Sequence, residues 1–169
     1  MLRSSAIIGI PRRLVLIWAG LLLLGVGELF LGSAPVRAQR SGGTVTIGLQ
    51  VGEPGGLTGK VYRSPHTAYT GLLTTDGDDF AALYLHRLHE RPLPDSLLHL
   101  YVGPGLLVGS ERLTSTPSLR IGLSTQIGLN FYADRFEVFV LTTPTLLFLP
   151  NFTPKVGGSV GLRYTLGGS

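Results

Sequence analysis

The amino-acid sequence predicts an all-β fold in which eight antiparallel strands follow one another in up-and-down order and close into a barrel. Three observations predict it. Apolar and polar residues alternate with a period of two over long stretches, most clearly from Leu119 to Phe131, as in a strand with two unlike faces. Turn-forming residues recur at short intervals, and no stretch shows a helical period. Short links force neighbouring strands to be antiparallel, and closing the sheet removes its exposed edges.

The first 38 residues are not expected to belong to this barrel. A basic start with Arg3, Arg12 and Arg13 precedes an apolar run over residues 14–27, and the small residues Val36 and Ala38 follow at cleavage-site spacing. This order predicts a cleaved secretory signal peptide over residues 1–38, with the barrel domain over 39–169. A retained membrane helix is the alternative, because the apolar run could be extended through Gly32.

Composition narrows the function classes. The whole chain has 14 basic and 10 acidic residues, but residues 1–38 carry four arginines and one glutamate, which leaves 14 − 4 = 10 against 10 − 1 = 9. A net charge near +1 gives no support to nucleic-acid binding. The chain has no cysteine, so disulfides, thiolate metal sites and a cysteine-linked lipid anchor are excluded.

The first four strands are separated by clear turn signals. Residues 44–51 place valine, isoleucine and leucine on one face until GEPGG at 52–56 breaks the pattern. The return strand is expected at 57–63, and SPH links it to a strand at 67–75. DGDD at 76–79 contains an Asp-Gly hairpin signal. The fourth strand, at 80–89, is expected to end at the proline-rich link ERPLPDS.

The last four strands alternate more regularly. The strand at 97–109 has Leu100, Val102 and Leu106 on one face and Gly103 and Gly105 on the other. The strand at 119–131 is followed by the turn YADR, the strand at 136–149 by PNFTP, and the last strand is expected at 155–166. If the barrel spans a bacterial outer membrane with its amino terminus in the periplasm, SPH, ERPLPDS and YADR would be periplasmic. The other links would face outward, and the longest of them, 109–118, is the predicted place for a binding partner.

Alternation alone fits two kinds of barrel: a soluble, lipocalin-like barrel that binds an apolar ligand, and a barrel whose apolar face meets lipid. Thirteen residues rise about 43 Å, enough to cross a ~25 Å apolar band at a steep tilt. Aromatic residues gather at two turns, as they do at membrane interfaces: Phe131, Tyr132 and Phe136, then Phe148 and Phe152. Small residues crowd the polar face, as a narrow lumen requires: Gly48, Gly103, Gly105, Gly122, Gly128, Gly157 and Gly161. These features favour lipid.

With these strands, and with GEPGGLTGK at 52–60 and GGSVGLRYTL at 157–166, the chain resembles the eight-stranded outer-membrane barrels of the OmpA/OmpX type. More narrowly, it is similar to a small, largely uncharacterised family of bacterial barrel proteins. The resemblance covers nearly all of residues 44–166. It implies a bacterial outer-membrane location, contact with outer-membrane lipids, insertion by the outer-membrane assembly machinery and a monomeric state. A structural or surface-interaction role without enzymatic activity is predicted as well, because the sequence has no recognisable catalytic cluster and an eight-stranded barrel has no room for a pore.

The candidate site is a polar network in the lumen. Lys60, Arg120 and Arg163 are expected to point inward, together with Glu137. A buried cation needs a partner, so these residues are expected to share a carboxylate. Their hydrogen bonding would be completed by His99, Tyr101 and Gln126. The predicted role is a structural plug, because the interior of an eight-stranded barrel is normally filled by side chains; a gated proton or small-ion path is the alternative.

Other motifs predict no chemistry, and no cofactor or metal is expected. His86 and His89 in HRLHE are an odd number of residues apart, so they face opposite sides of a strand and do not share a metal. DGDD is too short for a calcium loop, and NFT at 151–153 is interpreted as a turn. No recognisable set of serine, histidine and acid residues indicates an enzyme.

Overall fold

The structure is a computed structural model that describes residues 42–75, 80–112 and 117–167. The predicted signal peptide, the DGDD link and the centre of the 109–118 link lie outside the described residues. Eight strands follow one another along the described chain: β1 (Val45–Gly52), β2 (Gly56–Ser64), β3 (Thr67–Thr75), β4 (Phe80–Pro92), β5 (Leu98–Arg112), β6 (Pro117–Ala133), β7 (Phe136–Leu149) and β8 (Thr153–Gly167).

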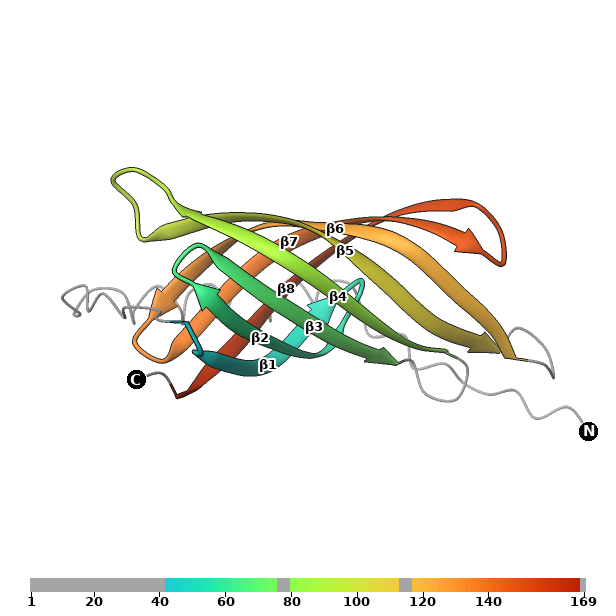
Figure 1. Cartoon of the computed structure of the whole chain (residues 1–169), viewed down its shortest axis with the longest axis horizontal. Helices are drawn as coiled ribbons and strands as arrows, with labels where there is room; N and C mark the ends of the chain where they lie inside the picture. Colours follow the sequence, from blue (N-terminus) through green and yellow to red (C-terminus); the bar gives the residue numbers. More distant parts are fainter. Residues whose placement is uncertain (1–41, 76–79, 113–116, 168–169) are drawn as a thin grey trace, which may run out of the picture. The chain divides into compact units, whose positions relative to one another are not determined.

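The strands form one closed antiparallel barrel, as predicted. Each strand pairs with the next one along the chain, and β1 pairs with β8 to close the sheet. Figure 1 shows the β2–β3, β4–β5 and β6–β7 turns at the end of the barrel where β8 finishes. We call this the terminal end, and the opposite one the far end. Among the described residues, no helix has the length and apolar character needed to cross a membrane.

The observed strand limits match the predicted ones at β3 and β7, and the departure that matters for the interior is at the end of β4. The link ERPLPDS was expected to begin at Glu90, but β4 continues to Pro92. Glu90 pairs with Tyr101 and Pro92 pairs with His99, so the ladder runs on to the terminal end. A proline is tolerated there because it stands at the end of the strand, where its missing N–H costs least.

The two faces of the sheet are sorted as the alternation predicts. On the exterior, Leu123, Ile127 and Leu162 expose 49%, 41% and 47% of their surface. In the interior, Gln126 and Arg163 expose 2% or less. The barrel therefore has an apolar exterior and an interior that contains most of its buried polar and charged groups.

The interior is more apolar than the sequence indicated. One buried cluster lies among Leu72, Ala82, Tyr84, Leu107 and Leu147, and a second contains Leu88, Tyr101, Phe139 and Leu141. Two of the large rings, both in the second cluster, are accommodated because each lies across from a glycine. Tyr101 is paired with Gly128, and Phe139 with Gly161. A Cβ added at Gly128 would lie 2.5 Å from the Tyr101 hydroxyl, so the ring occupies the space that a side chain would need.

Candidate functional site

Lys60 is the centre of a buried charge network. Because it alternates with the outward-facing Val61, β2 points its side chain into the barrel, where its ammonium group is fully buried. Lys60 Nζ donates to Glu137 Oε1 at 2.9 Å and to the Tyr132 hydroxyl at 3.2 Å. It also forms an ion pair with Glu90. The ammonium lies 4.7 Å from the centre of the Tyr62 ring, which adds a cation–π contact.

Arg163 is the second cation of the network. It is directly paired with Glu137 across β7 and β8, and its Nη1 donates to Glu137 Oε1 at 2.9 Å. Its Nε and Nη2 donate to the Thr58 hydroxyl at 3.2 and 3.0 Å. The guanidinium carbon lies 3.9 Å from the centre of the Phe139 ring. Arg163 is therefore held by an ion pair, a hydroxyl group and an aromatic face.

Glu90 is the second carboxylate. It accepts hydrogen bonds from Asn130 Nδ2 at 3.1 Å, from the Tyr132 hydroxyl at 2.9 Å and from the Tyr62 hydroxyl at 3.4 Å. Together with Lys60, these donors surround a carboxylate that is 1% exposed. Buried charges are tolerated when they are paired and hydrogen-bonded. Two cations and two carboxylates leave this charge network with no net charge.

The predicted lumen residues do not all meet. The structure brings Lys60, Glu137 and Arg163 together, with one oxygen of Glu137 accepting from both cations. Arg120 lies apart from them: it pairs with Glu111, and both side chains are partly exposed. These two residues lie near the ends of β5 and β6 that face away from the terminal end. Arg120 therefore does not share the Glu137 carboxylate, which is the departure from the expected network.

The remaining predicted residues lie at the margins of the network. Tyr101 is buried with its ring 5.8 Å from Lys60 Nζ, and its hydroxyl has no hydrogen-bond partner among the described residues. Gln126 is buried and accepts a hydrogen bond from Thr70 at 3.4 Å. His99 is half-buried and packs edge-on against the Tyr132 ring at 5.1 Å between centroids.

Sequence reasoning missed Glu90 and misplaced Tyr132. Glu90 has the same parity as the buried His86, and alternation would have found it if the proline-rich segment had been treated as strand. Tyr132 was expected in an interfacial aromatic cluster, but β6 continues to Ala133. Because of this continuation, Tyr132 is in phase with the inward-facing Asn130. The Tyr132 hydroxyl accepts a hydrogen bond from Asn130 Nδ2 at 2.7 Å.

One contact inside the barrel has the form of a nucleophile beside a base. His86 Nε2 lies 2.8 Å from the Ser124 hydroxyl. His86 Nδ1 has no partner among the described residues, whereas a catalytic pair needs a third group that orients the base. Both side chains are at least 95% buried, so the contact satisfies a buried hydroxyl. His89 points outward, as parity predicts, and no three metal-ligating side chains among the described residues gather around a common point.

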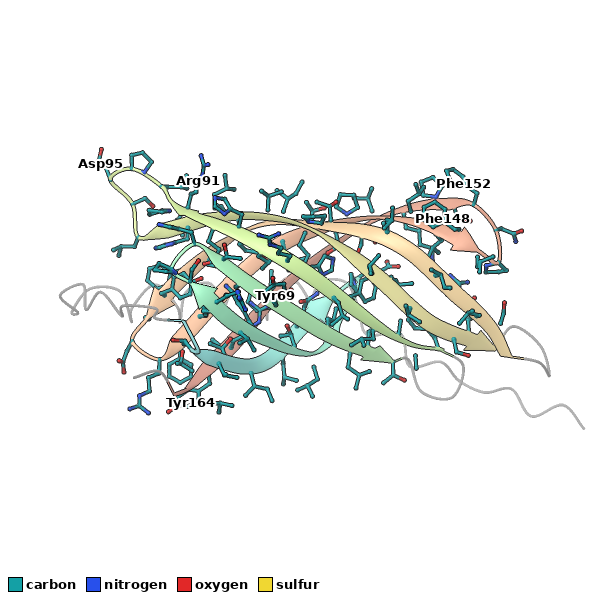
Figure 2. The ribbon with its side chains drawn as sticks, viewed as in Figure 1. Tyr69, Arg91, Asp95, Phe148, Phe152 and Tyr164 are labelled. Atoms are coloured by element: carbon teal, nitrogen blue, oxygen red, sulfur yellow. The ribbon has the colours of Figure 1, made fainter. Side chains whose placement is uncertain are left out.

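Aromatic side chains mark both ends of the apolar exterior. At the terminal end, Phe136 and Tyr164 pack edge to face with centroids 5.3 Å apart. At the far end, Phe148 and Phe152 pack at 6.2 Å. Figure 2 shows Tyr164 and the Phe148–Phe152 pair at opposite ends of the barrel. An apolar band flanked by aromatic side chains, around a polar interior, is the general architecture of outer-membrane β-barrels.

Comparison with solved structures supports the same fold. The crystal structure of the N-terminal β-barrel domain of Pseudomonas aeruginosa OprF matches with a TM-score of 0.62 and 12% sequence identity, over 75% of this chain and 100% of that domain. The match confirms the predicted resemblance to eight-stranded outer-membrane barrels at the level of fold. No protein family and no curated protein matches the sequence.

Proposed function

We propose that this chain is a small integral outer-membrane β-barrel protein with a structural or surface-interaction role. One observation carries the proposal: the polarity of the barrel is inverted relative to a water-soluble protein. Valine, leucine and isoleucine side chains are exposed along all eight strands, while Lys60, Glu90, Glu137 and Arg163 are 1% exposed. Exposed apolar patches on soluble monomers rarely exceed a few hundred Å², whereas lipid is the natural solvent for such a surface.

The geometry disfavours a soluble barrel that binds an apolar ligand. That alternative needs Leu123, Ile127 and Leu162 to line a cavity, and Arg163 to be solvated. The structure places the three apolar side chains on the exterior and Arg163 inside, bonded to Glu137 and Thr58.

The charge network supports a plugged barrel over a conducting one. Four charged groups, the hydroxyl groups of Tyr62 and Tyr132 and the amide of Asn130 form one connected polar cluster in the interior towards the terminal end. The ring-bearing apolar clusters fill further parts of the same interior. Wild-type protein in a planar bilayer is therefore expected to show no steady conductance; regular single-channel openings would support the small-ion path instead.

The first test is membrane fractionation of cells that express the native-length chain. The protein should be recovered in the outer-membrane fraction. It should migrate there as a fast, compact band that shifts on boiling, because heat unfolds the barrel. Recovery as a soluble periplasmic protein would refute the membrane location, and recovery without a heat-dependent shift would refute the folded barrel.

We further propose that the far end faces outward and the terminal end faces the periplasm. The chain contains no cysteine, so single cysteines can report the orientation. Asn151→Cys, in the β7–β8 turn, should react with a membrane-impermeant maleimide in intact cells. Arg135→Cys, in the β6–β7 turn, should react only after the outer membrane is opened. The reverse pattern would invert this topology while leaving the barrel itself intact.

A further inference from the structure

Three arginines interrupt the apolar exterior, and all three lie in one sector of the barrel. They are Arg63 on β2 and Arg87 and Arg91 on β4, and each is exposed. Of the other charged side chains described in the strands, only Lys155 is exposed; it lies near the far end of β8, in phase with the inward-facing Ser159 and Arg163. Two exposed histidines, His66 and His89, lie in the same sector. We call these five residues the basic stripe.

The strand register holds the basic stripe together. Arg87, His89 and Arg91 are successive outward residues of β4, and His89 is paired with Thr67, next to His66. Arg91 Nε donates to His89 Nε2 at 3.3 Å, and the His66 and His89 rings lie 6.5 Å apart. Arg87, Arg91, His66 and His89 therefore lie side by side on β4 and the β2–β3 turn, and Arg63 stands near the end of β2, next to that turn.

The basic stripe runs from the rim into the apolar band. Arg91 lies beside the turn that contains Asp95, at the same end as Tyr164 (Figure 2). Arg87 precedes Pro92, the last residue of β4, by five positions. At about 3.3 Å per residue and a tilt near 40°, its Cα lies about 13 Å from the end of that strand, measured along the barrel axis. Arg87 is flanked by Tyr69 on β3, which is also exposed.

The stripe has no partner of opposite charge in the described chain. The ion pairs among the described residues involve Lys60, Arg120 and Arg163, and none involves an arginine of the stripe. A lipid-facing arginine deep in the band is costly unless its guanidinium finds a polar partner. Arginine can reach along an apolar surface to place its charged head in a polar layer. Arg87 therefore needs an anionic partner in the polar layer, at the height of Arg91 along the barrel axis.

We propose that the basic stripe binds the phosphate headgroup of an anionic phospholipid in the leaflet at the terminal end. This inference rests on the proposed membrane location. Charge complementarity argues for it, because phosphate accepts the paired N–H donors of arginine. A second copy of this chain would be a poor occupant, since the outward faces of its described strands carry no carboxylate to match the stripe.

The test uses protein from the full chain, purified in detergent from the outer-membrane fraction and checked for the heat-dependent gel shift. Native mass spectrometry measures how many molecules of phosphatidylglycerol or phosphatidylcholine bind across a titration. The variants are Arg87→Gln, Arg91→Gln and the double variant. The matched control, Arg135→Gln with Lys155→Gln, removes two positive charges from exposed positions outside the stripe.

Wild type and the control are expected to bind one phosphatidylglycerol tightly and to bind phosphatidylcholine weakly. Each single variant should weaken phosphatidylglycerol binding about fivefold, and the double variant about thirtyfold. If the double variant fails to fold, Arg91→Gln at the rim provides the comparison.

Equal binding of the two lipids by wild type would overturn the inference, as would an equal loss in the control and the double variant. A protein mass that drops from dimer to monomer in the double variant would instead identify a self-association surface, and this would also overturn it. Absence of the protein from the outer-membrane fraction would refute the proposed function, and the lipid inference with it, before any lipid is added.

Discussion

Replacing Lys60 with methionine is expected to destabilise the barrel by about 3–5 kcal/mol, the usual cost of removing one partner from a buried ion pair. Lys60 interacts with two carboxylates and one tyrosine hydroxyl group. Without it, Glu137 keeps Arg163, but Glu90 loses its ion pair with Lys60 and keeps the hydrogen bonds from Asn130, Tyr132 and Tyr62. The network changes from two cations and two carboxylates to one cation and two carboxylates, and an uncompensated negative charge remains inside the barrel.

A double-mutant cycle with Glu90→Gln isolates this effect. The second substitution removes the uncompensated charge and keeps an amide that is close in shape to the carboxylate. The double variant is therefore expected to cost at least about 1 kcal/mol less than the sum of the two single variants. Lys155→Met is the matched control, because Lys155 is exposed and its loss should change stability by no more than about 0.5 kcal/mol.

The measurement is urea unfolding of the protein folded in lipid vesicles, with the folded fraction read from the heat-dependent gel shift. Gels are preferable to fluorescence because Trp18, the single tryptophan, lies in the predicted signal peptide. A cost below about 1 kcal/mol for Lys60→Met would refute the reasoning. Strict additivity of the Lys60 and Glu90 substitutions would refute it as well, since it would mean that the two residues do not interact in the folded barrel.

Three further predictions use the same unfolding measurement. Arg163→Gln should cost about 3 kcal/mol or more because the side chain is buried. Arg120→Gln should cost about 1 kcal/mol or less because Arg120 belongs to a partly exposed ion pair. Equal costs would contradict the conclusion that Arg163 belongs to the buried charge network and Arg120 does not. Leu123→Arg, near the middle of β6, should cost about 2–4 kcal/mol in vesicles and Leu119→Arg, near its end, about 0–1 kcal/mol; the opposite order would place the membrane elsewhere. Gly161→Ala should cost about 1–3 kcal/mol because the new Cβ would lie 2.2 Å from the Phe139 ring. Gly158→Ala is the milder control, because its new Cβ meets its nearest atom at 4.0 Å. A neutral Gly161→Ala would mean that the ring moves freely.

The alternation of residue types determined most of the architecture. A period of two along β6 assigns Leu123 and Ile127 to one face and Gln126 and Asn130 to the other, and no packing detail is needed to see this. Short links then require antiparallel neighbours and a closed sheet. Local patterns sufficed here because side-chain direction in a strand depends on parity alone.

The ends of the strands were harder to predict than their middles. Proline and the charged pair Glu90–Arg91 resemble a link in sequence, yet they pair with β5 in the barrel. Residues 132–135 resemble a turn, yet Tyr132 is still in the strand. In both cases, pairing with a longer neighbouring strand extended the strand beyond its predicted end. Each additional paired residue satisfies backbone N–H and C=O groups, which in a link would need other hydrogen-bond partners.

By itself, the sequence determined that most strands have one apolar and one polar face, and that Lys60, Glu137 and Arg163 belong to the polar face. Only the tertiary structure decided which charges meet. Lys60 and Glu137 are 77 residues apart, and Arg163 lies 105 residues from Thr58. Their contacts depend on the register of every strand pair between them and on the closure of β8 onto β1. A buried ion pair forms only where these registers place both side chains at the same height along the barrel axis. No local pattern in the sequence encodes that height.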